Sequence, residues 1–244
     1  MNDHGQDDDE ALELPSDTLA ALQDFYSERD SREKRFADLR AEVERKGSLA
    51  QLSMDMFSED WNASQFWYSD ETATTLAKQL LEGASASTNI CIVSAPSVFV
   101  QLKNLLASEE RKVSDIRLLE YDKRFDVFEE FIYYDFEHPL KLPGGMKGRY
   151  DRILCDPPFL SPDCQTKAAL TARWLSKAKS TDPDPPNPRV IVCTGERMET
   201  LVHKLYPGIC TTTFDLQHAQ NRLSNDFRCY ANFECANWSW RELD

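Results

Sequence analysis

Tyr150-Asp-Arg-Ile-Leu-Cys-Asp-Pro-Pro-Phe159 joins a short apolar run to a stiff polar loop. The run Arg152–Cys155 is bounded by polar residues, which predicts a buried strand. The strand must stop at the two prolines, because proline has no N–H to donate to a neighbouring strand. Ligands of open α/β sheets bind at the carboxyl ends of strands. The loop offers a carboxylate, fixed carbonyls and an aromatic ring that together suit an amino group, so the candidate catalytic residues are Asp156, Pro157, Pro158 and Phe159.

The same tripeptide occurs again at Asp184-Pro185-Pro186, and this second copy serves as an internal control. No strand pattern precedes it, and Asn187 stands where the first copy has its aromatic residue. We interpret it as a plain loop within the proline-rich segment Ser180–Pro188.

Strand and helix patterns alternate along the chain on both sides of Tyr150–Phe159. Strands are predicted at 90–93, 116–119, 131–134, 152–155 and 190–193, and helices at 70–82, 98–107, 162–177 and 196–206, with residues 94–97 as a turn. This alternation implies a parallel sheet with right-handed crossovers. The runs 210–216 and 227–233 are predicted to form an antiparallel pair, which suits a seven-stranded methyltransferase sheet. The fold class is therefore α/β, a Rossmann-like class I methyltransferase sheet with helices on both faces.

The net charge of −14 is concentrated near the N-terminus. Residues 1–60 carry 7 Lys and Arg against 17 Asp and Glu, whereas the rest of the chain is close to neutral. We expect a disordered acidic tail at 1–14, a helical extension at 15–60 and the methyltransferase domain at 61–244. No basic footprint of a nucleic-acid binder is visible in the sequence.

Composition excludes several other classes. No apolar run approaches the length of a transmembrane helix, and the acidic N-terminus does not resemble a signal peptide. The seven cysteines include no C-x-x-C pair and the four histidines are scattered, so we expect no metal site. Unpaired cysteines within apparent strands favour a reducing compartment, the cytosol or the nucleus, and we expect the cytoplasm.

Candidate cofactor ligands follow the predicted strands. A carboxylate after the second strand can bind both ribose hydroxyls of a nucleoside, and Glu120 and Asp122 both qualify, with Glu120 favoured. Asp135, after the third strand, is either a ligand of an adenine amino group or a turn-forming aspartate. The turn at Ser94 and Ala95 has no glycine, which disfavours a diphosphate such as NAD but not S-adenosylmethionine. The aromatic residues before the first helix either pack in the core or wall the cofactor: Phe66, Trp67 and Tyr68.

Six segments resemble the elongation factor 1-alpha lysine methyltransferase 1 family, formerly labelled N6-adenine-specific DNA methyltransferase 2. They are Leu19-Ala-Ala-Leu-Gln-Asp-Phe-Tyr26, Ser64-Gln-Phe-Trp-Tyr-Ser69, Val93-Ser-Ala-Pro-Ser-Val98, Glu120-Tyr-Asp-Lys-Arg-Phe125, Asp156-Pro-Pro-Phe159 and Phe227-Arg-Cys-Tyr230. The third and fourth are specific, whereas the Asp-Pro-Pro-Phe type is shared with adenine and glutamine methyltransferases. The chain departs from the family at Ser27–Asp55 and in the proline-rich loop, which bears on substrate docking more than on chemistry.

The resemblance implies S-adenosylmethionine as methyl donor and a lysine of translation elongation factor 1-alpha as acceptor. Separately, we expect a monomer without membrane attachment. Two alternatives stay open. An N6-adenine methyltransferase acting on DNA or RNA would have a similar loop but must also extrude and stack a base. The second alternative is a non-catalytic binding module that has the fold of a cofactor-binding enzyme. The intact Asp156–Phe159 loop argues against it.

Overall fold

The computed structural model describes residues 66–109, 112–179, 187–219 and 226–242, together with single positions between 18 and 57. The acidic tail predicted at 1–14 lies outside these residues. So do most of the helical extension predicted at 15–60 and most of the loop Ser180–Pro188. Those assignments, and the domain boundaries drawn from them, stay predictions.

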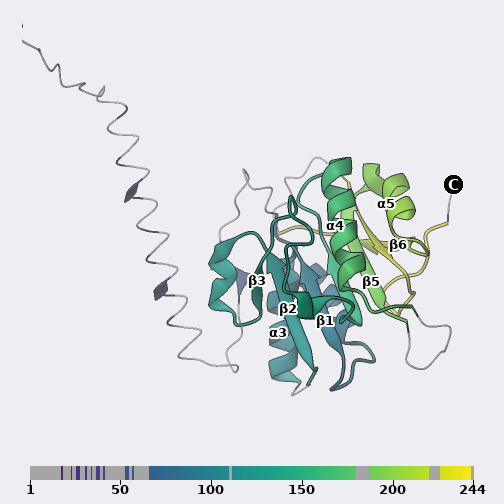
Figure 1. Ribbon diagram of the computed structural model, residues 1–244, viewed down its shortest axis with the longest axis horizontal. Helices are drawn as coiled ribbons and strands as arrows, with labels where there is room; N and C mark the ends of the chain where they lie inside the picture. The colour runs from purple at the N-terminus through teal and green to yellow at the C-terminus, as the bar shows by residue number, and fades with distance from the viewer. Residues whose placement is uncertain are drawn as a thin grey trace, which may run out of the picture.

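A seven-stranded sheet in the order β3-β2-β1-β4-β5-β7-β6 forms the centre of the molecule (Figure 1). Its strands are β1 (Asn89–Val93), β2 (Asp115–Glu120), β3 (Phe131–Tyr133), β4 (Arg152–Cys155), β5 (Arg189–Gly195), β6 (Cys210–Asp215) and β7 (Phe227–Ala231). Strands β1 to β5 are parallel, and β7 runs antiparallel between β5 and β6. The predicted α/β sheet with a terminal antiparallel pair is therefore confirmed.

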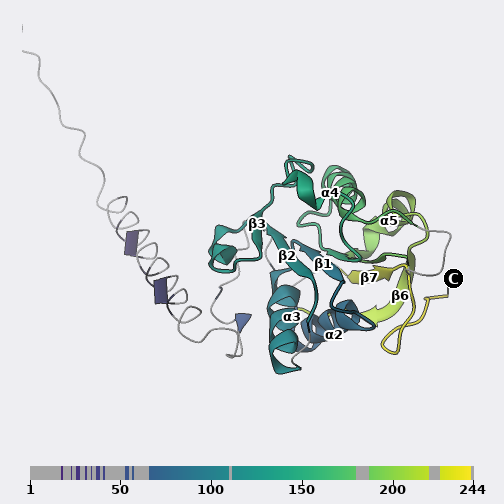
Figure 2. The same cartoon turned by 60° about the horizontal axis from the view of Figure 1, so that its bottom comes forward.

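Helices cover both faces of this sheet, as Figure 2 shows. One face carries α2 (Asp70–Leu81) and α3 (Pro96–Ser108), and the other carries α4 (Pro162–Leu175) and α5 (Glu199–Leu205). Successive side chains of a strand point to opposite faces. In β1, Ile90 and Ile92 accordingly join the core under α2 and α3, while Cys91 and Val93 join the core under α4. None of the helices described is both long and apolar enough to cross a bilayer.

Helix α3 begins earlier than the sequence patterns predict. We expected a turn at residues 94–97 and a helix from Val98, but Pro96 and Ser97 already belong to the helix. A proline suits the first helical position, since its fixed φ is helical and the N–H that it lacks would have no partner there. The turn is therefore only Ser94 and Ala95. The predicted helix at 196–206 likewise starts as a short 3-10 helix, η6 (Glu196–Met198).

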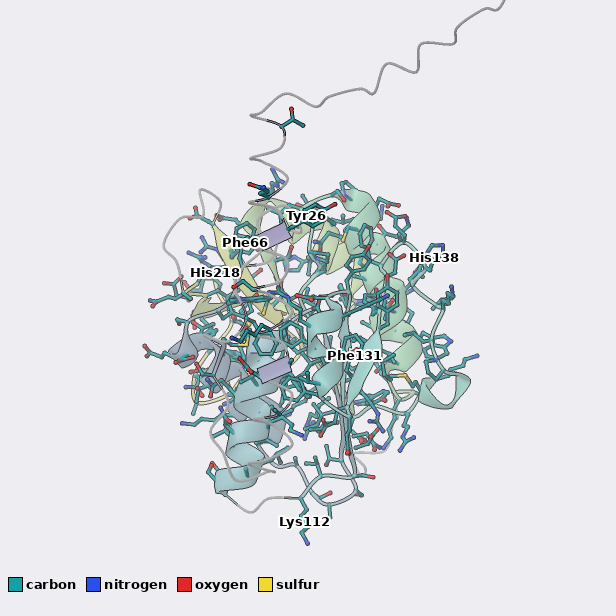
Figure 3. All side chains as sticks on the ribbon, turned by 90° about the vertical axis from the view of Figure 1, so that its left-hand side faces the viewer. Tyr26, Phe66, Lys112, Phe131, His138 and His218 are labelled. Atoms are coloured by element: carbon teal, nitrogen blue, oxygen red, sulfur yellow. The ribbon has the colours of Figure 1, made fainter. Side chains whose placement is uncertain are left out.

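The strand order reverses between β1 and β4, which are direct neighbours. Their last residues, Val93 and Cys155, are in register, so the chain leaves the sheet there at Ser94 and Asp156. We call this side the carboxyl edge and the opposite side the amino edge. Figure 3 shows Phe66 and His218 at one end of the domain and Lys112, which precedes β2, at the other. A strand-order reversal is where open α/β sheets bind ligands.

Candidate active site

Asp156 is the first residue after β4 at the carboxyl edge. Its backbone N–H donates to the Val93 carbonyl over 3.0 Å, which ties the loop to β1. Its side chain is half-buried, and burial together with the nearby negative charge of Glu120 raises the pKa of Asp156 to about 7. No Lys or Arg forms an ion pair with Asp156 in the part of the chain that the structure describes. The site therefore contains a carboxylate that lacks a positive partner.

Tyr68 supplies the hydrogen bond that Asp156 does make. The phenol donates to Asp156 Oδ2 over 2.7 Å, although the two residues are 88 positions apart. The Tyr68 side chain is buried at 3% exposure, and its burial and the adjacent carboxylate raise its pKa well above the ordinary value. Tyr68 therefore stays protonated and acts as a donor.

The rest of the loop is held from three directions. The Phe159 carbonyl accepts a hydrogen bond from Gln165 Nε2 of α4 over 3.1 Å, and the same nitrogen donates to Thr194 of β5. Gly195 lies close to the Leu160 side chain, since a Cβ there would be 2.8 Å from a Leu160 methyl carbon, which would have to shift. These contacts fix the loop backbone before any ligand binds.

Phe159 is the exposed member of the loop. Its ring is 39% exposed and lies edge-on to Phe136, with ring centroids 5.5 Å apart. Pro157 is buried and Pro158 is half-buried. An aromatic face that is packed on one side and open on the other can contact the methylene stem or cationic head of an incoming amine.

Glu120 is the last residue of β2, on the other side of β1 from Asp156. Its Oε1 accepts the backbone N–H groups of Tyr121 and Asp122 over 2.9 and 3.0 Å. Burial raises the pKa of Glu120 to about 7. Within the described ranges, Oε2 makes no hydrogen bond, which leaves one carboxylate oxygen for a ligand.

The two other acidic candidates already have protein partners. Asp122 begins the short helix η4 (Lys123–Val127), accepts the Arg124 N–H over 2.9 Å and pairs with the Arg124 guanidinium at 2.6 Å. Asp135 accepts the Glu137 N–H and contacts His138, the geometry of a turn-forming aspartate, and the His138 hydrogen bond lowers the pKa of Asp135. The geometry favours Glu120 over Asp122 as the ribose ligand and the turn role for Asp135, and these assignments stay predictions.

The three aromatic candidates divide between core and site. Trp67 is buried, donates from Nε1 to the Phe57 carbonyl over 3.0 Å and lies edge-on to Phe125, which is core packing. Phe66 is half-buried. Tyr68 contacts the predicted catalytic loop, where its partner is Asp156.

The remaining cofactor candidates lie between the two carboxylates. Ser94 has φ of 57°, the one positive φ among the described residues other than glycine, and its N–H donates to the Leu119 carbonyl over 2.8 Å. Such backbone strain gathers at functional sites. Ala95 is the N-cap residue that precedes α3, and its methyl side chain cannot bond the first N–H groups of the helix. Pro96 has no N–H and the Val98 N–H donates to the Ala95 carbonyl over 3.1 Å, so Ser97 carries the amide at this helix start that suits a ligand.

Sequence reasoning missed the supporting residues of this site. Gln165, Thr194 and His218 belong to no motif, because their roles depend on which strand ends become neighbours. The His218 ring lies 4.9 Å from the Tyr68 ring, and burial lowers the pKa of His218 to about 4, so it is neutral at pH 7. No cluster of three or more His, Cys, Asp or Glu suited to a metal occurs among the described residues.

Comparison with known proteins gives consistent matches. A family model described as "Probable N6-adenine methyltransferase" matches residues 59–235. A Saccharomyces cerevisiae protein named "Protein-lysine N-methyltransferase EFM5" is 42% identical over 93% of this chain and 94% of its own length. Proteins named "EEF1A lysine methyltransferase 1" from Gallus gallus and Homo sapiens are 39% and 36% identical, each over 93% of this chain and 96% and 95% of their own.

Among solved structures, a branched-chain polyamine synthase from Thermus thermophilus, crystallised with N4-aminopropylspermidine and 5'-methylthioadenosine, has a TM-score of 0.54. The alignment covers 77% of this chain and 63% of the synthase at 9% identity, so the similarity concerns the fold alone.

Proposed function

The chain belongs to the EEF1A lysine methyltransferase 1 family, and on that premise we propose that it transfers a methyl group from S-adenosylmethionine to a lysine of translation elongation factor 1-alpha. The observation that carries the proposal is the pair of carboxylates at the strand-order reversal, Glu120 and Asp156. Both are bonded by neutral donors and neither by a cation in the described chain. A positively charged donor and an amine acceptor both suit such a site.

The residues between these carboxylates fit S-adenosylmethionine. The free Oε2 of Glu120 suits the ribose hydroxyls, and the uncapped start of α3 suits a carboxylate, since helix N-termini favour negative charge. The cofactor needs no glycine-rich phosphate cradle, and the turn at Ser94 and Ala95 has none. When bound, it supplies a sulfonium methyl group that an amine takes up by in-line displacement while the C–S electron pair stays on sulfur.

Asp156 orients the amine in this scheme. A lysine with pKa near 10.4 must first lose a proton, which near pH 7.4 costs about 4 kcal/mol. A carboxylate nearby favours the ammonium form, whereas desolvation and a neighbouring positive charge favour the neutral amine. We therefore assign Asp156 and the Pro157 carbonyl to positioning the nitrogen, with the proton leaving to solvent. Phe159 covers the methylene stem of the lysine.

An N6-adenine methyltransferase is the second candidate, favoured by the description of the matching family model. The names of the relatives that match over nearly the whole chain favour a protein lysine instead. An adenine-specific enzyme must also hold an extruded base. The net charge of −14 does not suit a nucleic-acid polyanion.

Location and assembly belong to the same proposal. We place the protein in the cytoplasm as a monomer that meets its elongation-factor substrate there. The seven cysteines are all free, and five of them are buried, which suits a reducing compartment. Cell fractionation tests the location and light scattering of the full chain tests the assembly.

Labelled S-adenosylmethionine in a cell lysate distinguishes the functions. Full-length protein is incubated with lysate, with and without nuclease, and the labelled products are separated by size. Label in a protein of elongation-factor size, mapped to lysine by mass spectrometry, supports the proposal. Nuclease-sensitive label supports the adenine alternative, and no label supports the non-catalytic module. Asp156→Ala serves as the inactive control.

A further inference from the structure

Tyr68 is buried at the carboxyl edge and hydrogen-bonded there to the predicted catalytic loop. Its hydroxyl donates to Asp156 Oδ2 over 2.7 Å, and its side chain is 3% exposed. We propose that Tyr68 is a positioning residue of the methyl transfer, which binds one oxygen of Asp156 and so presents the other, Oδ1, to the substrate amine. This inference rests on the proposed function, because it assigns a role within the same site.

The backbone around Tyr68 is held against the segment that follows β6. Tyr68 and His218 form an isolated antiparallel bridge. On either side of it, the Ser69 N–H donates to the Gln217 carbonyl and the Ala219 N–H donates to the Trp67 carbonyl, both over 2.8 Å. The side chains of Tyr68 and His218 also pack, with ring centroids 4.9 Å apart. The phenol therefore reaches Asp156 from a fixed support.

A second anchor comes from helix α2, which starts directly after Tyr68. Ser69 caps it by accepting the Thr72 N–H over 3.2 Å, and the Thr72 hydroxyl accepts the Gln217 N–H over 3.1 Å. Because Tyr68 is fixed by main-chain bonds on both sides, its hydroxyl is a pre-organised donor. A donor of this kind favours one orientation of the carboxylate before substrate arrives.

The hydrogen bond also affects which charge state Asp156 adopts. A phenol O–H donated to a carboxylate favours the ionised form, and it counteracts the burial that raises the Asp156 pKa to about 7. Among the described residues, the ionisable groups around this pair are Glu120 of β2, Cys155 of β4, Cys193 of β5 and His218, and burial raises the pKa of Cys155 to about 12. The hydrogen bond with Cys229 and burial raise the Cys193 pKa well above its ordinary value, and burial lowers the pKa of His218 to about 4. Only Glu120 titrates in the same range as Asp156.

The competing interpretation is that Tyr68 merely fills space. Tyr150 offers a matched control, because it is also a buried tyrosine whose hydroxyl donates to an aspartate, Asp115 Oδ2 over 3.4 Å. Asp115 begins β2 and Tyr150 precedes β4, so this pair lies at the amino edge. Tyr68→Phe and Tyr150→Phe each remove one hydroxyl and keep the ring.

Single-turnover methylation of elongation factor 1-alpha is measured from pH 6 to pH 9 with the full chain and both variants. For Tyr68→Phe we expect the acid limb of the pH–rate profile to move to higher pH by about one unit. The reason is that losing a hydrogen bond to a charged carboxylate changes its ionisation equilibrium by about tenfold or more. The rate at the plateau should also fall, with calorimetric affinity for S-adenosylmethionine unchanged. For Tyr150→Phe the acid limb should stay where it is in the wild type. Equal shifts in both variants, or none in either, overturn the proposal.

A second readout does not depend on turnover. Selective carbon-13 labelling of aspartate carboxyl groups allows the Asp156 signal to be assigned with Asp156→Asn and titrated without interference from Glu120. The Asp156 pKa should be higher in Tyr68→Phe than in the wild type and unchanged in Tyr150→Phe. An unchanged Asp156 pKa in Tyr68→Phe refutes the inference. If the wild type methylates no protein lysine, the proposed function fails, and this titration still decides whether Tyr68 controls Asp156.

Discussion

Four acidic side chains, two at each edge of the sheet, differ in the partners that the chain provides for them. At the amino edge, Asp115 pairs with Arg117 at 3.0 Å, and Asp151 pairs with Lys177 at 2.6 Å. At the carboxyl edge, Glu120 and Asp156 have only backbone N–H groups and a phenol as donors among the described residues. Both edges are built from the same strands. The difference therefore lies in which charges the chain itself supplies.

Asp122 at the carboxyl edge pairs with Arg124, but Glu120 and Asp156 have no cation, and on the proposed function their positive charge arrives with the ligands. A buried carboxylate without a cation is costly to ionise, and the pKa values of Glu120 and Asp156 are both raised to about 7. Perturbed carboxylates of this kind gather at functional sites. On the proposed function, Asp115 and Asp151 contribute to stability and Glu120 and Asp156 to binding, and this contrast can be tested residue by residue.

The largest effect is expected at Asp156. Asp156→Ala removes both the charge and the acceptor oxygens, and we expect the single-turnover rate to fall by about 100-fold or more. Asp156→Asn keeps an acceptor of the same shape, so on the positioning interpretation it retains measurable activity. Cofactor affinity should change little in either variant. If Asn and Ala are equally inactive, Asp156 acts as a base. If Asp156→Asn, Asp156→Ala and Phe159→Leu all match the wild type, the loop is not the active site.

The next effect is expected at Glu120. Glu120→Ala removes the free Oε2, and the loss of a hydrogen bond to a charged group should weaken S-adenosylmethionine binding by about 1.5–3 kcal/mol. Isothermal calorimetry measures this directly. Asp122→Ala is the matched control, since the Asp122 carboxylate is already bonded to Arg124. A larger loss at Asp122 than at Glu120 would reverse the assignment.

Stability should respond with opposite signs at the two edges. The folded-state pKa of Glu120, about 7, lies above the ordinary 4.5, so its contribution to stability is full below pH 4.5 and is lost as the pH rises through 7. Glu120→Gln should therefore stabilise the ligand-free protein at pH 8 by roughly 1–3 kcal/mol, and by almost nothing near pH 4. Asp151→Asn should destabilise it at pH 8 by about 0.5–1 kcal/mol. Denaturant unfolding at both pH values measures the change in unfolding free energy for each variant. If Glu120→Gln and Asp151→Asn change the stability at pH 8 in the same direction, the contrast between these residues fails.

The smallest effect is expected at Asp135, which lies at the carboxyl edge but already has protein partners. Its oxygens accept the Glu137 N–H and contact His138. Asp135→Asn should therefore change cofactor affinity by about twofold or less. A tenfold loss in a calorimetric titration would instead identify Asp135 as a ligand of the adenine amino group.

Local patterns were enough to predict most of the fold. The strand Arg152–Cys155 is apolar between polar neighbours, and the helix after Ser69 has a clear cap. The start of α3 was missed because Pro96 was treated as part of a turn, although proline also suits the first residue of a helix. Ser94 was unforeseeable in another way, since positive φ normally calls for glycine.

The site was only partly predictable because its contacts are distant in sequence. Asp156 and Glu120 follow strand patterns and could be found from them. The bond from Tyr68 to Asp156 depends on sheet order and on the bridge to His218, which no local pattern encodes. Glu120 and Asp122 could be distinguished only after the capping role of Asp122 was known.

The bridge between Tyr68 and His218 joins segments that the ribosome makes at very different times. Thr72 and Gln217, which bond each other beside it, are 145 positions apart, so the partner leaves the ribosome long after Tyr68. Strands β1 to β5 can pair before that point, but Tyr68 acquires its support only when the segment after β6 has been made. Domains are completed from the N-terminus onward during translation. Strand β7 (Phe227–Ala231) follows His218 in sequence and joins β6 to β5, so both the sheet and the support of Tyr68 are completed only when nearly the whole domain has been made.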